Sequence, residues 1–145
     1  MEIPYHEDLT FVDTNVLIDD EDVPQSAAIT PKVWREVEYF NKKGKIAADT
    51  CKRLRLVTMF PESAPKGLNV LVISKDHRKD FYRLRKMALE IARGRFQNDS
   101  LQDYRARDNI SMTDAELAAY CVLTRGKLLT NDKLLRVTVQ EMKKY

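Results

Sequence analysis

The chain has 145 residues, 43% of them hydrophobic and 32% charged, and its 25 basic and 22 acidic residues give a net charge of +3. This composition is that of an ordinary soluble globular protein, and the length predicts a single domain over residues 1–145 whose core needs no disulfide. No apolar run approaches the ~20 residues of a membrane span, and the two cysteines lack metal-ligand spacing. We therefore expect a cytoplasmic protein with no membrane partner.

The first half of the chain predicts one strand followed by three helices. Residues 9–12 form an apolar run that suits a strand, and a short helical pattern covers residues 16–18. A Thr-Pro pair is typical of a helix N-cap and first helical position, so the next helix is expected over residues 30–44, where a glycine ends it. The apolar spacing continues as another helix over residues 45–57.

The middle of the chain predicts a buried strand and a long helix. Residues 69–73 are a continuous apolar run, which is typical of a strand buried on both faces. Residues 80–93 carry an apolar stripe at helical spacing, whereas residues 94–112 are polar and have no regular period.

The last third predicts a helix, a strand and a final helix. The first of these helices opens at residues 111–113 and runs to Leu123, and Gly126 ends it. Residues 127–130 suit a strand, and the final helix follows, although residues 137–139 also fit an extended segment. Strands that alternate with helices predict an α/β fold in three layers, with a central, mainly parallel sheet of about four strands and helices on both faces.

Two aspartates follow predicted strands. Asp13 comes directly after the first strand and Asp132 after the last, and each precedes a helix. The carboxyl ends of parallel strands meet at one edge of a sheet, where ligands bind, so we expect both carboxylates at that edge. Asp13 should be displayed to a site rather than buried; the alternative is that it serves as a helix N-cap or turn former.

Two further acids belong to predicted helices. At about 100° per residue, Glu36 falls on the margin of the apolar stripe of its helix, whereas Glu38 points away. On the later helix, Asp114 lies in the middle of the buried stripe at the N-terminal end, whereas Glu116 faces water. The alternatives are helix capping for Asp114 and a salt bridge to an arginine for Glu36.

These four acids predict a metal site. Four carboxylates that converge on one place repel one another or become protonated unless a cation holds them. Because the ligands would be oxygen atoms, with no histidine or cysteine nearby, the expected cation is Mg²⁺ or Mn²⁺ rather than zinc. Such an ion polarises a phosphoryl oxygen and activates a bound water at neutral pH, so the set predicts hydrolysis of a phosphodiester bond.

Four segments of the chain resemble the motifs of the PIN domain, a fold of metal-dependent ribonucleases that includes VapC-type toxins and the PIN domains of PhoH-like proteins. The similar segments are Phe11–Ile18, Val33–Phe40, Thr113–Ala119 and Leu128–Lys133. They occur in the order of the family and are spread over most of the chain. Two features depart from it: the family usually adds a short strand after the fourth motif, where this chain reads as helix, and residues 94–112 form a longer polar segment than expected.

The resemblance implies a catalytic set and its partners. Its carboxylate metal ligands are Asp13, Glu36, Asp114 and Asp132. Asn15 supports the first ligand, and Thr130 offers a supporting hydroxyl. The implied cofactor is Mg²⁺ or Mn²⁺, and the implied substrate is single-stranded RNA. Dimers are common in this family and a partner protein silences its toxin members, so a homodimer and an inhibitory antitoxin-like partner are candidates that the sequence neither shows nor excludes.

Basic side chains between the second and third motifs are candidates for holding a phosphate backbone. Arginine binds phosphates through paired hydrogen bonds and positions a strand without reading its sequence. The candidates are Arg83, Arg85, Lys86, Arg93, Arg95, Arg105 and Arg107. The alternative is a solvated helix face. Trp34, beside the second motif, is assigned to the core rather than to base stacking.

Three other functions compete with the ribonuclease. A catalytically silent PIN-like module that binds RNA or a protein has no physical reason to keep four mutually repelling carboxylates. A phosphatase with a nucleophilic aspartate at the end of the first strand needs an acid two residues later, where this chain has Asn15. A structure-specific DNA nuclease with a related carboxylate cluster needs extra helices for which the chain is too short.

Overall fold

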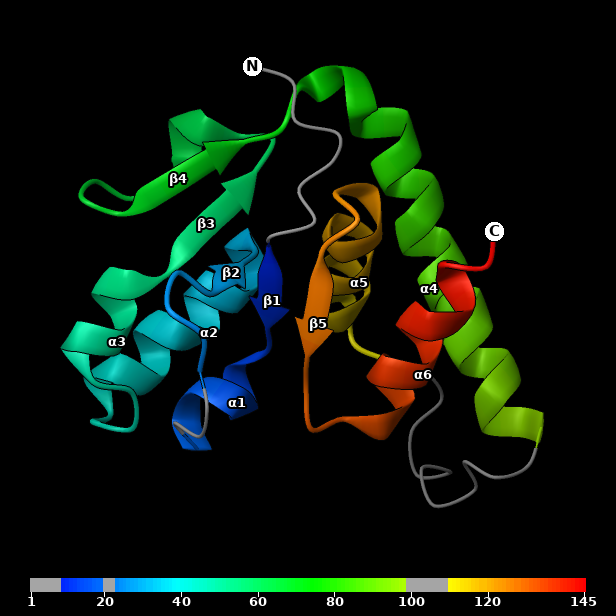
Figure 1. Ribbon diagram of the computed structural model, residues 1–145, viewed down its shortest axis with the longest axis horizontal. Helices are drawn as coiled ribbons and strands as arrows, with labels where there is room; N and C mark the ends of the chain where they lie inside the picture. The colour runs from blue at the N-terminus through cyan, green and yellow to red at the C-terminus, as the bar shows by residue number, and fades with distance from the viewer. Residues whose placement is uncertain (1–8, 20–22, 99–109) are drawn as a thin grey trace.

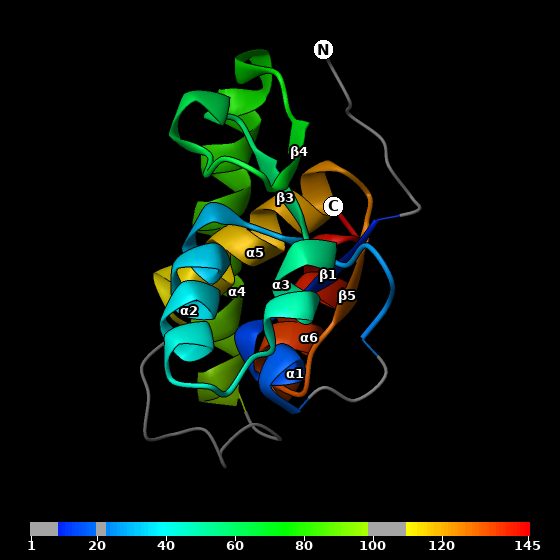
Figure 2. The same ribbon diagram turned by 90° about the vertical axis from the view of Figure 1, so that its left-hand side faces the viewer.

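The computed structural model describes residues 9–19, 23–98 and 110–145, and within them five strands form one sheet (Figure 1, Figure 2). The strands are β1 (Thr10–Val12), β2 (Ala28–Ile29), β3 (Arg55–Thr58), β4 (Asn69–Val72) and β5 (Lys127–Leu129). Their order is β4-β3-β2-β1-β5, and every neighbouring pair runs parallel. The predicted α/β class and parallel sheet are confirmed, with five strands in place of about four.

Helices connect the strands. The α-helices are α1 (Thr14–Asp19), α2 (Pro31–Lys42), α3 (Ala48–Arg53), α4 (Arg78–Asn98), α5 (Met112–Leu123) and α6 (Lys133–Met142), and the 3₁₀ segments are η1 (Pro61–Ser63) and η2 (Lys75–His77). The start of α2 is as predicted, because the Thr30 hydroxyl accepts a hydrogen bond from the Val33 N–H at 3.4 Å. Gly44, with φ of 76°, follows its end. In the described part of the chain, no helix is both long and apolar enough to cross a membrane.

Strands β2 and β3 were not predicted. β2 is only two residues long, too short to establish an alternating pattern. β3 lies between β2 and β4, and its residues Leu56, Val57 and Thr58 are all buried. A strand buried on both faces loses the alternation that identifies it. The apolar residues of β3 therefore also fitted the helical spacing, which made the predicted helix over 45–57 too long; α3 ends at Arg53.

The second half of the chain follows the predicted order with two corrections, and one open alternative is decided. α4 extends to Asn98 rather than ending at Arg93, so the polar segment expected from residue 94 begins inside a helix. Residues 137–139 are helical and belong to α6. Arg125 is the residue with a positive φ, 57°, after α5. Gly126 serves close packing instead, because an added Cβ would lie 3.0 Å from Cε2 of Phe11.

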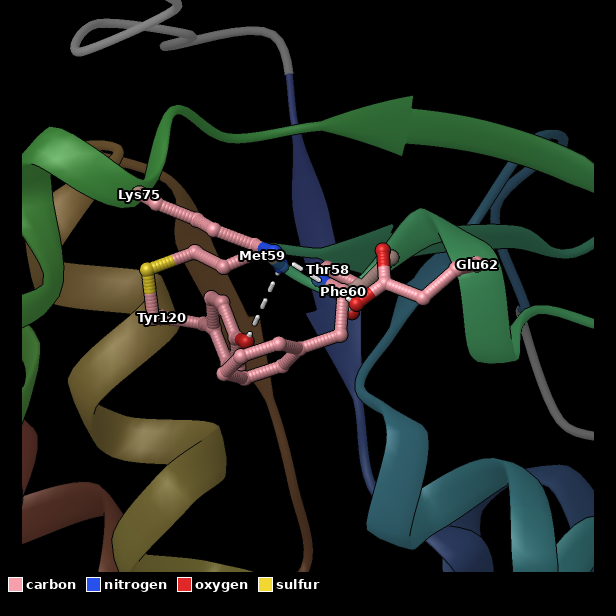
Figure 3. A network of polar contacts seen from close by, with 6 residues as sticks. All are labelled: Thr58, Met59, Phe60, Glu62, Lys75 and Tyr120. Atoms are coloured by element: carbon pink, nitrogen blue, oxygen red, sulfur yellow. Dashed lines mark hydrogen bonds and ion pairs between the residues drawn. The ribbon is translucent and has the colours of Figure 1, made fainter.

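Helix α5 is buried on several sides, and two of its polar residues reflect this. The Tyr120 hydroxyl accepts a hydrogen bond from the Met59 N–H at 3.4 Å, just beyond the end of β3 (Figure 3). Burial raises the pKa of Tyr120 to about 12, so the phenol stays neutral. Glu116 was expected to face water and does not: its side chain is 13% exposed and pairs with Arg85 at 2.9 Å. The reason is that α4 packs along α5 and covers the side on which Glu116 lies.

Candidate functional site

The pairing of β1 with β5 brings Asp13 and Thr130 together. The register aligns Val12 with Leu129, so Asp13 and Thr130 are the next residues along the two parallel strands. The Thr130 hydroxyl donates a hydrogen bond to Oδ2 of Asp13 and accepts one from the Asp132 N–H at 3.0 Å. The supporting role predicted for Thr130 therefore has a direct geometric basis.

Asp13 is both a helix cap and a wall of a cleft. Its Oδ1 accepts a hydrogen bond from the Val16 N–H at 3.2 Å, which is the geometry of an N-cap of α1. The residue is 7% exposed, so the expectation of an openly displayed carboxylate is wrong. Burial, and to a smaller extent the negative charge of Asp132, raises the pKa of Asp13 above its usual value, although the hydrogen bonds from Thr130 and Val16 oppose the shift. A buried carboxylate beside a second carboxylate favours a proton or a cation.

Asp132 caps the last helix while it borders the same cleft. Its Oδ1 accepts a hydrogen bond from the Leu135 N–H at 3.2 Å at the start of α6. The side chain is partly exposed and lines the cleft together with Asp13. Asp13 and Asp132 therefore each cap a helix and also line the cleft.

Glu36 reaches the cleft from α2. It accepts a hydrogen bond on Oε1 from the hydroxyl of Thr14, the residue after Asp13. Within the described residues, no ion pair with an arginine holds Glu36, so the salt-bridge alternative has no support there. Glu38 on the same helix is exposed and does not line the cleft, as the helical projection predicted.

Asp114 reaches the cleft from the start of α5. Ser111 is the N-cap of this helix, and its hydroxyl accepts a hydrogen bond from the Asp114 N–H at 3.1 Å. Asp114 is half-buried rather than central to the buried stripe. Because Ser111 supplies the cap, the carboxylate of Asp114 is not the capping group of α5.

All four predicted acids line a single cleft of about 510 Å³. The lining residues are Asp13, Thr14, Asn15, Val33, Arg35, Glu36, Tyr39, Phe40, Ser111, Thr113, Asp114 and Asp132. Among the described residues, no three side chains of the metal-binding types stand close enough together to enclose an ion in this conformation. The donor set is nevertheless all oxygen, and the raised pKa of Asp13 marks a place where positive charge lowers the free energy. These residues therefore fit Mg²⁺ or Mn²⁺ in chemistry.

The predicted phosphate-binding cations do not border this cleft where they are described. Arg83 pairs with Asp80 at 3.7 Å, and Arg85 pairs with Glu116. Lys86 and Arg93 are exposed on α4. The remaining candidates lie outside the described side chains, namely Arg95, Arg105 and Arg107. Substrate binding by these residues stays a prediction.

The sequence reasoning missed three residues of the cleft. Thr14 was not assigned a role because its partner Glu36 is 22 residues away and the pairing depends on how α1 packs on α2. Arg35 and Tyr39 flank Glu36 on α2, and a helical projection around Glu36 would have found them. Asn15 is exposed and lines the cleft, and its role as a support of Asp13 stays a prediction.

The chain matches no protein-family model, no curated protein and no solved structure.

Proposed function

We propose that this chain is a metal-dependent endoribonuclease of the PIN type that hydrolyses phosphodiester bonds of single-stranded RNA. One observation carries the proposal: carboxylates from four separate places in the chain, Asp13, Glu36, Asp114 and Asp132, line one cleft beside the carboxyl ends of β1 and β5. The three-layer arrangement of that family and its cytoplasmic location belong to the same proposal. So do a homodimer and an inhibitory antitoxin-like partner.

The four carboxylates are the proposed ligands of Mg²⁺ or Mn²⁺. Bound there, the ion would supply charge stabilisation for the phosphate and an activated water. Thr130 fixes Asp13 by a hydrogen bond to Oδ2, and Thr14 fixes Glu36 by a hydrogen bond to Oε1. Both hydroxyls hold a carboxylate in one rotamer, which is the usual task of groups behind metal ligands. Asn15, exposed at the cleft, is placed to donate its amide hydrogens to a substrate oxygen.

Cleavage of a pool of RNAs, with and without Mn²⁺ and with the ends mapped, tests the proposal. We expect cleavage by the wild-type protein that EDTA abolishes and that Asp13→Asn abolishes without loss of the fold. The matched control is Asp49→Asn, because Asp49 is exposed on α3 and does not line the cleft. Equal activity of the purified Asp13→Asn and Asp49→Asn proteins would mean that the nuclease is a contaminant and would remove the proposal.

The second candidate is a silent PIN-like module that binds RNA or a protein. It is favoured by the observation that the described acids do not enclose an ion as they stand. Titration with Mn²⁺ separates the two functions. The nuclease binds Mn²⁺ in a manner that depends on Asp13 and Asp132, whereas a silent module shows no binding that substitution of these residues changes.

A further inference from the structure

Basic and aromatic side chains alternate along one side of α2. Arg35 and Tyr39 of α2 and its C-cap residue Lys43 are spaced four residues apart, so they lie on one side of the helix at intervals of about 6 Å along its axis. Val33 and Val37 are buried on the opposite side, which turns the three side chains toward solvent. Figure 2 shows α2 on the outside of the molecule, with α5 behind it. We call Arg35, Tyr39 and Lys43 the α2 strip.

The strip begins at the acidic cleft. Arg35 and Tyr39 both line it, next to Glu36. Among the described lining residues, Arg35 is the one cation, and no ion pair in the described part of the chain ties it to a carboxylate. A guanidinium with open donors beside a cluster of carboxylates can hold a phosphate that would otherwise be repelled by them.

Tyr39 presents an aromatic surface to solvent. It is 56% exposed and lines the cleft. Phe40 meets it edge-on with the ring centres 5.1 Å apart, and Nζ of Lys43 lies 5.6 Å from the ring centre. Contacts with Phe40 and Lys43 therefore restrict the orientation of the Tyr39 ring, and a base can stack on it with little loss of side-chain entropy.

We propose that the α2 strip is a nucleotide-binding subsite that holds single-stranded RNA beside the acidic cleft. One base stacks on the ring of Tyr39, and Arg35 and Lys43 bind phosphates of the strand on the two sides of that base. Arg35 and Lys43 are eight residues apart, about 12 Å along the helix axis, so they reach two phosphates that are not adjacent in the strand. The inference rests on the proposed ribonuclease function for its choice of RNA, and it assigns substrate contacts beside the cleft, which the described cations of α4 do not line.

RNA binding and RNA cleavage are measured separately, so that the α2 strip and the ribonuclease function can each be disproved independently of the other. Dissociation constants of a fluorescent oligouridine are measured by anisotropy over a series of salt concentrations, in protein that also carries Asp13→Asn. Tyr39→Ala should weaken binding about 10-fold or more without changing the salt dependence, and Tyr39→Phe should restore it. Arg35→Gln and Lys43→Gln should each lower the slope of log affinity against log salt by about 0.7, the value for one lost phosphate contact to a single strand.

Matched controls are Tyr145→Ala and Arg78→Gln, both exposed and outside the cleft lining. An oligonucleotide that lacks bases should bind equally well with and without the Tyr39→Ala substitution, since it has nothing to stack. The inference is overturned if Tyr39→Ala and Arg35→Gln bind oligouridine like the controls, or if the unsubstituted strip binds no RNA. Mn²⁺-dependent cleavage by the wild-type protein is scored independently: its absence removes the nuclease, while the binding pattern decides the strip.

Discussion

The hydroxyl of Thr130 donates a hydrogen bond to the carboxylate of Asp13 from the neighbouring strand end, 117 residues away in sequence. The same hydroxyl accepts the Asp132 N–H at 3.0 Å. One side chain thus contacts two of the four acids, Asp13 at its carboxylate and Asp132 at its backbone N–H. Because the hydrogen bond from Thr130 also opposes the rise in the pKa of Asp13, its loss has both a structural and an ionisation effect.

Thr130→Val should lower the free energy of unfolding by about 1–3 kcal/mol, since it leaves buried polar groups without a partner. It should also raise the pKa of Asp13 further and move the acidic limb of the cleavage pH profile to higher pH. Thr130→Ser keeps the hydroxyl and should restore both properties. Thr138→Val is the control, because the Thr138 hydroxyl bonds only within α6, to the Leu134 carbonyl at 2.7 Å. An unshifted pH profile in Thr130→Val would contradict this role.

Ionisation of the buried Asp13 carboxyl should make the metal-free protein less stable at neutral pH than it would be with Asp13 protonated. Burial raises the pKa of Asp13 in the folded protein above its ordinary value of 3.8. The contribution of Asp13 to the free energy of unfolding is therefore complete below pH 3.8 and is lost as the pH rises through the raised pKa. Asp13→Asn removes this titration, so the metal-free variant should lose less stability than the wild type as the pH rises from acid to neutral. Mn²⁺ should then stabilise the wild type but not the variant. An equal loss of stability over this pH range in both proteins, measured in EDTA, would contradict the raised pKa of Asp13.

Thr14 should act on catalysis through Glu36. Thr14→Val removes the hydroxyl that fixes Oε1 of Glu36, and a group of this kind is worth about 10- to 100-fold in activity or metal affinity. We expect kcat to fall by that factor with little change in RNA affinity, and Thr14→Ser to recover it. Steady-state kinetics on a mapped RNA substrate provide the measurement. A rise in KM at constant kcat would assign Thr14 to substrate binding instead.

Arg85 should be a structural residue rather than a phosphate ligand. Its guanidinium pairs with Glu116 on α5 and lies 4.9 Å from the ring centre of Tyr82. Arg85→Ala should lower the free energy of unfolding by about 1–2 kcal/mol and leave RNA affinity unchanged. Arg83→Ala is the matched control on the same helix, since its pair with Asp80 is exposed and should contribute nothing measurable. Weaker RNA binding by Arg85→Ala at full stability would restore its predicted substrate role.

Two glycines should respond to alanine in opposite directions. At Gly126 an added Cβ would lie 3.0 Å from the Phe11 ring and 3.2 Å from the Leu9 carbonyl, so Gly126→Ala should destabilise the protein by about 1–3 kcal/mol. At Gly94, inside α4, nothing lies within 4 Å, and Gly94→Ala should stabilise it by about 0.5–1 kcal/mol. Chemical denaturation measures both. Equal effects of the two substitutions would contradict the close packing at Gly126.

The sequence predicted a side chain's position best where a single strand or helix determines that position. An aspartate after a parallel strand must lie at the sheet edge, and the side of α2 on which Glu36 lies follows from helical spacing alone, so the acids of the cleft could be predicted. The surroundings of a side chain depend on other elements. Glu116 was wrongly expected to face water because the sequence of α5 does not show that α4 packs against it. β3 was missed because a fully buried strand has no alternation of apolar and polar residues.

Strand β5 joins the sheet beside β1, although the two lie near opposite ends of the sequence. During translation, residues up to Asp132 must therefore be synthesised before Asp13 can contact Thr130 or lie beside the carboxylate of Asp132. A partly made chain holds the first two acids without the last. The cutting activity proposed for this protein would consequently be delayed until the ribosome has translated the chain as far as Asp132.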